Sequence, residues 1–209
     1  MLLFVSAPFI QELPSGRFID GILVTALLLA AVFAVGGRHR SLAVGLILGG
    51  PVFLARWIHH LWPAEGVDRF YVCSFLLFLA FIVGQFLRFI LRSPRVNSEV
   101  VCAAISVYLL LGLIWAGCYA FVARLNPAAF SGVPPSNQPL HGFDALYFSL
   151  ITLTTVGYGD IAPATGTARM LAMLEAVTGT MYMAVLVARL VSLYTSAPPS
   201  EEVGRSSST

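Results

Sequence analysis

The sequence predicts an all-α membrane protein with about five transmembrane helices. Of its 209 residues, 58% are hydrophobic and only 11% are charged, whereas a soluble domain carries roughly 25% charged residues. The mean hydropathy is +0.86, and apolar runs recur along the chain at about the 20 residues that a helix needs to cross the hydrocarbon core. The formal net charge of +2 argues against a nucleic-acid-binding protein, which needs a strongly basic face.

The first three apolar runs predict a three-helix membrane region over residues 1–97. The first run covers residues 18–35. The second, residues 42–55, is the least regular because Gly49-Gly50-Pro51 interrupts it. It spans the membrane only if the Trp-containing stretch that follows lies at the interface, where Trp is common. The third run extends from residue 70 to about residue 89.

Two further runs frame the C-terminal half of the chain, residues 98–195. The fourth run, residues 100–122, has no charged side chain, and the fifth, residues 170–187, has one carboxylate. A loop rich in Pro, Gly and Ser occupies residues 126–143. We expect the polar residues 196–209 to form a short disordered cytoplasmic tail.

The Arg residues predict an orientation. All 12 basic residues are Arg; Arg38 and Arg40 follow the first run, and Arg88, Arg92 and Arg95 follow the third. Five spans place seven Arg on the side of these clusters and five on the other. Since basic loops stay in the cytoplasm, we expect the N-terminus outside and the C-terminus in the cytoplasm of the cell.

The cluster of Arg88, Arg92 and Arg95 has two interpretations. A voltage sensor needs several Arg at three-residue spacing within a span, in a bundle with acidic partners. Here the three lie four and three residues apart at a helix end beside Pro94. We therefore favour contact with lipid headgroups or control of topology.

The segment that indicates a function lies between the fourth and fifth runs. Residues 144–153 are apolar but too short to span, and predict a half-length helix. This helix leads into Thr155-Val156-Gly157-Tyr158-Gly159, the sequence of potassium-channel selectivity filters, in which carbonyl oxygens replace the hydration shell of the ion. An ordinary strand turns only alternate carbonyls to one side, so the filter needs left-handed backbone, which Gly157 and Gly159 permit.

The filter motif predicts the ligands and the assembly. We expect K+ to bind oxygens of Thr155, Val156, Gly157 and Tyr158, with no cofactor. A ring of carbonyls needs four such segments, and the chain contains one. We therefore expect a homotetramer in the lipid bilayer, with a re-entrant pore helix and a filter loop in each subunit.

From about residue 100 to residue 193, the chain resembles the pore module of the potassium channel superfamily, in particular bacterial channels of the KcsA type. Pro163, Thr165 and Arg169 follow the motif as in that family, and Gly179 lies 19 residues after Asp160. The resemblance implies that residues 98–195 form a pore domain of outer helix, pore helix, filter and inner helix.

The resemblance also implies residues that support the filter. In the family, the Asp that corresponds to Asp160 braces the filter from behind by bonding to an aromatic side chain of the pore helix. Here Tyr147 stands in the place of the family's Trp, so its hydroxyl is the expected partner. Ile151 replaces a family Glu, so that acid is missing. Thr154, directly before the filter, completes the expected support.

Glu175 is an acid inside an apolar span, which marks a functional position by default. One hypothesis places it behind the filter, bonded to Ser149 or Thr152 of the pore helix, where it replaces the acid missing at Ile151. The alternative is that Glu175 faces the cavity and concentrates cations.

Gly179 is either a hinge of the inner helix, as its spacing suggests, or a close-packing residue, since small residues are common at membrane helix contacts. In the family's register, the cavity and gate are lined by Thr180, Met183, Val187 and Val191. A ring of such apolar side chains closes a pore by excluding water.

The sequence thus predicts a potassium-selective channel that conducts passively. It is not expected to be an enzyme, since no motif of a hydrolase, metalloprotease or nucleotide-binding loop is present. The alternatives are a weakly selective cation channel and, less favoured, a membrane-anchored sensor or enzyme with a relic filter. Cys73, Cys102 and Cys118 lie in apolar runs without metal-site spacing, so we expect three buried apolar side chains.

Overall fold

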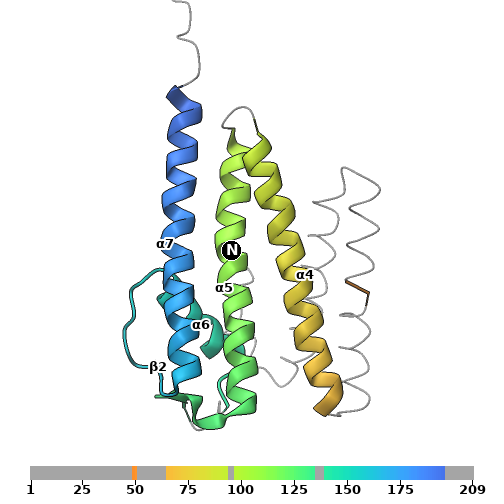
Figure 1. Ribbon diagram of the computed structural model, residues 1–209, viewed down its shortest axis with the longest axis vertical. Coiled ribbons are helices and arrows are strands. Elements are labelled where there is room, and N and C mark those ends of the chain that lie inside the picture. Colours follow the sequence, from red (N-terminus) through yellow and green to blue (C-terminus); the bar gives the residue numbers. More distant parts are fainter. Residues whose placement is uncertain (1–48, 51–64, 94–96, 135–138, 196–209) are drawn as a thin grey trace, which may run out of the picture.

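The computed structural model of the chain describes residues 49–50, 65–93, 97–134 and 139–195, and this part is mostly helical (Figure 1). The predicted runs at residues 18–35 and, apart from two residues, 42–55 lie outside the described residues, as does the predicted tail.

Three helices of the described part are long and apolar enough to cross a membrane. They are α4 (Glu65–Arg92), α5 (Ser98–Leu125) and α7 (Gly166–Thr195). Their candidate spans have 21, 28 and 27 residues, so even the shortest covers about 30 Å. The third, fourth and fifth predicted runs are therefore helices, each extending beyond the run itself.

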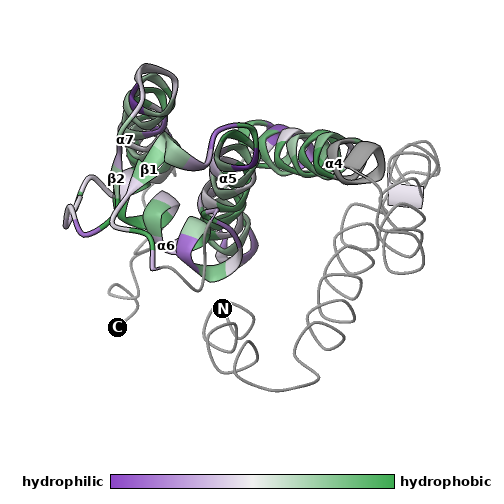
Figure 2. Cartoon of the chain, turned by 90° about the horizontal axis from the view of Figure 1, so that it is seen from below, coloured by the Kyte–Doolittle hydropathy of each residue, from purple (hydrophilic) through white to green (hydrophobic). Residues whose placement is uncertain are grey.

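Helix α6 (Gly142–Leu153) has only 12 residues and follows the polar loop after α5. It is apolar but too short for a span, as the sequence predicted for residues 144–153. In Figure 2, α7, α5 and α4 are seen nearly end-on in that order, with α6 beside α5 and α7. Helix α5 is central, because it packs against α4, α6 and α7.

An Asn residue caps each end of α5. The Asn97 side chain accepts a hydrogen bond of 3.0 Å from the Val100 amide, which satisfies one of the donors left free at a helix start. At the other end, the Asn126 amide donates to the Val122 carbonyl, and the Asn126 side chain accepts from the Ala128 amide. The same residue therefore ends α5 and begins the short 3-10 helix η1 (Pro127–Ala129).

The loop expected over residues 126–143 contains more order than its composition indicates. After η1, strand β1 (Phe130–Ser131) pairs antiparallel with β2 (Ala162–Pro163), which follows the filter segment. The next residue, Gly132, has a φ of +81°, and a Cβ there would collide with the Asp160 carbonyl oxygen. The loop after α5 thus lies directly against the end of the filter segment.

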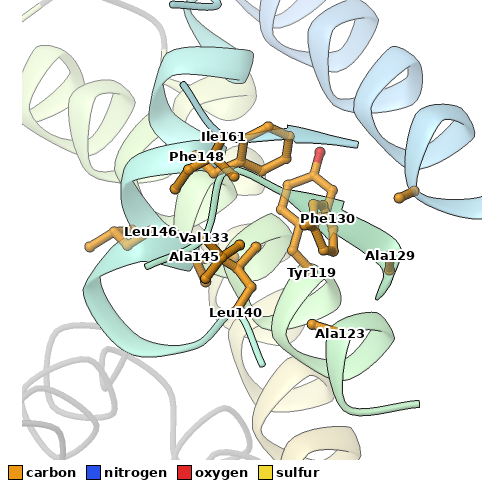
Figure 3. Close-up of a cluster of buried hydrophobic side chains, with 12 residues drawn as sticks. Tyr119, Ala123, Ala129, Phe130, Val133, Leu140, Ala145, Leu146, Phe148 and Ile161 are labelled. Carbon is orange, nitrogen blue, oxygen red and sulfur yellow. The ribbon is translucent and has the colours of Figure 1, made fainter. Parts of the chain in front are cut away.

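Two clusters of buried side chains hold the helices together. The first surrounds α6, and its centre is a group of three mutually edge-on rings, Tyr119, Phe130 and Phe148, with centroids 4.8–5.6 Å apart (Figure 3). Such contacts stabilise a core beyond the area they bury. The second cluster joins α4, α5 and the later part of α7.

The expectation of three buried cysteines is wrong. Cys73 and Cys102 are exposed on the described chain and Cys118 is half-buried. The apolar runs that contain Cys73 and Cys102 belong to helices with faces that no described segment covers, and periodicity alone does not tell which face a residue occupies.

Gly179 is buried where α7 crosses the end of α6. A Cβ at this position would collide with the backbone carbonyl oxygen of Leu153 and lie 3.1 Å from its side chain. Helix α7 continues through Gly179 from Gly166 to Thr195. Of the two interpretations of Gly179, the observed contact is that of the close-packing residue.

Replacing Gly179 by Ala is expected to destabilise the protein by about 1–3 kcal/mol, because the backbone of α6 must move to admit the methyl group. Thermal unfolding of the purified chain in detergent measures this. The matched control is Gly84→Ala in α4, where a Cβ meets nothing within 4 Å. This change should stabilise the helix by about 1 kcal/mol, because Ala is more favourable than Gly inside a helix. Equal melting temperatures for the two variants would contradict the close contact.

Candidate ion-conduction site

The amides at the start of the filter segment, residues 155–159, bond back to the end of α6. Val156 and Gly157 both donate to the Ile151 carbonyl, at 2.9 and 3.1 Å, and Thr155 donates to the Thr152 carbonyl at 2.9 Å. The last carbonyls of a helix have no partner within it. The amides of the segment therefore supply the donors that the last carbonyls of α6 lack. These three amides therefore point away from any ion path on the other side of the segment.

Thr154 joins α6 to the filter segment. Its amide and its hydroxyl both donate to the Leu150 carbonyl, at 3.1 and 2.7 Å. This predicted support residue closes the last turn of α6 and fixes the direction in which the filter segment leaves.

The filter segment alternates in backbone conformation. Thr155, Gly157 and Gly159 have positive φ values of 61°, 51° and 81°, so every second residue is left-handed. The two glycines adopt the conformation for which the sequence singled them out. Thr155 was not expected to do so, and a left-handed residue with a side chain costs roughly 1–2 kcal/mol. Such strain persists only where the surroundings enforce it, and here the bonds to α6 do so.

The side chains of the filter segment are uncovered in the single chain. Val156 is 54% exposed and Tyr158 is 73% exposed. The described chain therefore leaves both side chains largely without protein around them.

Asp160, at the end of the filter segment, accepts a hydrogen bond of 2.7 Å from the Tyr147 hydroxyl of α6. This is the contact that the resemblance implied, with Tyr in place of Trp. The bond from Tyr147 holds the pKa of Asp160 below its usual value, so the carboxylate is charged at neutral pH. The adjacent Phe148 lies within the aromatic group with Tyr119 (Figure 3).

Glu175 is fully buried between three helices. The Ser149 hydroxyl of α6 lies 2.5 Å from one carboxylate oxygen, and the Tyr119 hydroxyl of α5 donates to the other. Ser149 also lies 2.7 Å from the Gly112 carbonyl. Of the two contacts that the first hypothesis named, the structure shows the one with Ser149 of α6, and the carboxylate is buried in the described chain. The Thr152 hydroxyl instead donates within α6.

Tyr119 is the residue of this group that sequence reasoning missed. It lies 56 residues before Glu175, and nothing in the spacing connects the two. The usable signal was that a phenol in an otherwise apolar run needs a partner when it is buried.

The segment after the filter anchors the start of α7. The Arg169 side chain donates to the Pro163 carbonyl at 3.2 Å, and the Thr165 hydroxyl accepts from the Ala168 amide at 3.4 Å. These three residues of the resemblance thus cap and brace the helix.

The predicted cavity and gate residues all lie on uncovered parts of α7. The set comprises Thr180, Met183, Val187 and Val191. The Thr180 hydroxyl bonds to its own helix, at 2.6 Å from the Ala176 carbonyl. Within the described residues, no three His, Cys, Asp or Glu side chains come together as a metal site.

Replacing Glu175 by Leu is expected to lower the stability by about 1–3 kcal/mol, because the buried Tyr119 hydroxyl loses its acceptor. At about 2–4 °C per kcal/mol for a chain of this size, thermal unfolding in detergent resolves the change. Glu175→Gln keeps an acceptor oxygen and should lose less. Glu99→Gln, on the exposed first turn of α5, is the control. A Glu175→Leu variant as stable as this control would refute the three-helix contact.

Known proteins resemble part of this chain, including the residues of the candidate site. A family model described as an ion channel matches residues 105–196. Two-pore potassium channel 4 of Arabidopsis thaliana is 47% identical over 49 residues, which cover 23% of this chain and 17% of the plant protein. Two pore potassium channel a of Oryza sativa subsp. japonica is 30% identical over 135 residues, or 61% of this chain and 36% of that protein.

An archaeal protein extends the comparison. A voltage-gated potassium channel of Aeropyrum pernix is 32% identical over 60 residues, which cover 29% of this chain and 20% of the relative. This chain therefore spans at most about a third of the length of these relatives. No solved structure matches the chain. The matched family is one of channels and not of enzymes, as the sequence predicted. Residues 105–196 of the chain therefore match a family of ion channels, and the relatives that the chain resembles are named as potassium channels.

Proposed function

We propose that this protein is one subunit of a tetrameric, potassium-selective channel that conducts K+ passively across the cell membrane. In this proposal, residues 98–195 are the pore domain, with α6 as the re-entrant pore helix. Residues 1–97 are a three-helix membrane region whose last helix is α4. Five spans place the N-terminus outside and the C-terminus in the cytoplasm.

The observation that carries the proposal is the exposed, non-helical backbone of residues 155–159. Irregular backbone at membrane depth is tolerated only where protein covers it or where it lines a water-filled path. The single chain covers it only on the side of α6. Further copies of the chain are the surroundings that the motif predicts, because they bring Val156 and Tyr158 against protein and leave the carbonyls around an axis.

Helix α7 supports the same assembly. Its candidate span is the least covered of the three, with 11% of its most apolar window buried in the chain, against 33% for α5. Large apolar side chains are exposed along most of its length, among them Met173, Val177, Met181 and Val185. An inner helix that contacts neighbouring subunits on one face and the cavity on another has this pattern.

The alternating backbone of the segment supports a mechanism of conduction. An entering K+ exchanges its water for oxygens of Thr155, Val156, Gly157 and Tyr158, and ions at adjacent sites push one another forward. The C-terminal end of α6 carries a partial negative charge, which favours a cation at the inner side. The names of the relatives, all potassium channels, support K+ as the permeant ion.

Reconstituted vesicles loaded with K+ are expected to release it, and external barium should block the release. Gly157→Ala should abolish flux, because the φ of +51° at Gly157 costs Ala roughly 1–2 kcal/mol in every subunit. Gly84→Ala, in open space on α4, is the matched control and should conduct normally. Absence of flux from the unmodified protein would contradict the channel, and equal permeation of Na+ and K+ would reveal a weakly selective cation channel instead.

The bond from Tyr147 to Asp160 should contribute to selectivity. We expect Tyr147→Phe and Asp160→Asn each to shift the reversal potential in mixed Na+ and K+ toward equal permeability. The double variant should be no worse than the worse single variant, because both changes break the same bond. Fully additive shifts would show that the two side chains act separately.

A further inference from the structure

Arg189 connects the end of α7 that lies far from the filter with α4. Its Nη2 donates to the Leu91 carbonyl at 3.1 Å and lies 3.4 Å from the Ser93 carbonyl. These carbonyls belong to the end of α4, where a helix has acceptors without partners and a partial negative charge. An Arg from a helix almost 100 residues later in the chain thus caps α4.

The surroundings of Arg189 argue against a side chain that simply extends into lipid headgroups. The guanidinium Nε is buried and has no hydrogen-bond partner among the described residues, which is unfavourable for a donor. Nearby, the apolar Ile90 of α4 and Leu186 and Leu190 of α7 belong to one cluster. The chain therefore holds a charged group in partly apolar surroundings. The bonds of Arg189 to the end of α4 offset part of the cost of removing its charge from water.

Two other contacts hold the middle of α7 against its neighbours. Gly179 packs on the end of α6, and the Tyr182 hydroxyl donates to the Ala104 carbonyl of α5 at 2.7 Å. Beyond Tyr182, Arg189 makes a further polar contact between α7 and another helix. The residues on either side of it, Val187 and Val191, are those expected to line the gate.

We propose that Arg189 is a latch that holds the gate end of the inner helix against α4. If the end of α4 is displaced, Arg189 loses its two acceptors. Through this contact, α4 transmits movements of the N-terminal membrane region to the gate end of α7 and so biases the opening of the pore. The mechanical contact stands on the geometry alone, whereas its effect on opening rests on the proposed channel function.

Amide hydrogen exchange on the full chain in lipid nanodiscs tests the contact. Arg189→Met keeps the apolar stem but cannot donate, so amides of residues 185–192 should exchange about ten-fold faster, which corresponds to the loss of one charge-assisted hydrogen bond. Arg189→Lys retains a cationic donor, so its exchange rates should lie between those of the unmodified protein and those of Arg189→Met. The control is Arg88→Met, the same change on an exposed side chain of α4, which should leave these amides unchanged. Unchanged or slower exchange in Arg189→Met would overturn the latch.

Potassium flux tests the consequence for opening. Arg189→Met should change the flux rate relative to the unmodified protein, while Arg88→Met should not. Faster exchange with an unaltered flux rate would refute the role in gating. If the unmodified protein gives no flux, the channel proposal fails, and the exchange experiment still decides whether Arg189 holds the two helices together.

Discussion

A membrane protein can expose irregular backbone only to protein or water, because hydrocarbon offers no hydrogen bonds. The contacts around the segment after α6 can be understood from this constraint. The segment after α6 is neither helix nor sheet ladder, and its first amides are satisfied by the last carbonyls of α6. One side of the segment is thereby covered within the chain, and the proposed assembly covers the other side with further copies of the chain.

The remaining contacts keep that segment in position from behind. Tyr147 holds the C-terminal end of the segment at Asp160, while Glu175 joins α6 to α5 and α7 through Ser149 and Tyr119. The strand pair β1–β2 brings the loop after α5 against the same end. The left-handed backbone of Thr155 is held by the amide bonds between the start of the segment and the end of α6, which is the condition under which local strain persists.

The helices and the local chemistry of the filter could be predicted from the sequence because each depends on nearby residues. Run length and hydropathy predicted three of the long helices and the short one, and glycine predicted left-handed backbone at Gly157 and Gly159. The Tyr147 partner of Asp160 came from the family resemblance. A contact of Glu175 with Ser149 or Thr152 was one of two hypotheses, which rested on the cost of a charge in a span and on the missing acid at Ile151.

The features that could not be predicted depend on pairs far apart in the chain. Tyr119 meets Glu175, Gly132 meets Asp160 and Arg189 meets the end of α4, and no spacing rule connects them. The exposure of Cys73 belongs with these, since it depends on which face of a helix is covered. The positive φ of Thr155 was missed for another reason: it results from amide bonds to α6 that oppose the residue's own preference.

The most direct test of the central claim is an electron cryomicroscopy structure of the full protein in nanodiscs with K+. The account predicts four copies around one axis, with Val156 and Tyr158 buried against protein and ion density between carbonyl layers of residues 155–158. A monomer, or an assembly in which the filter segments remain apart and exposed, would contradict it.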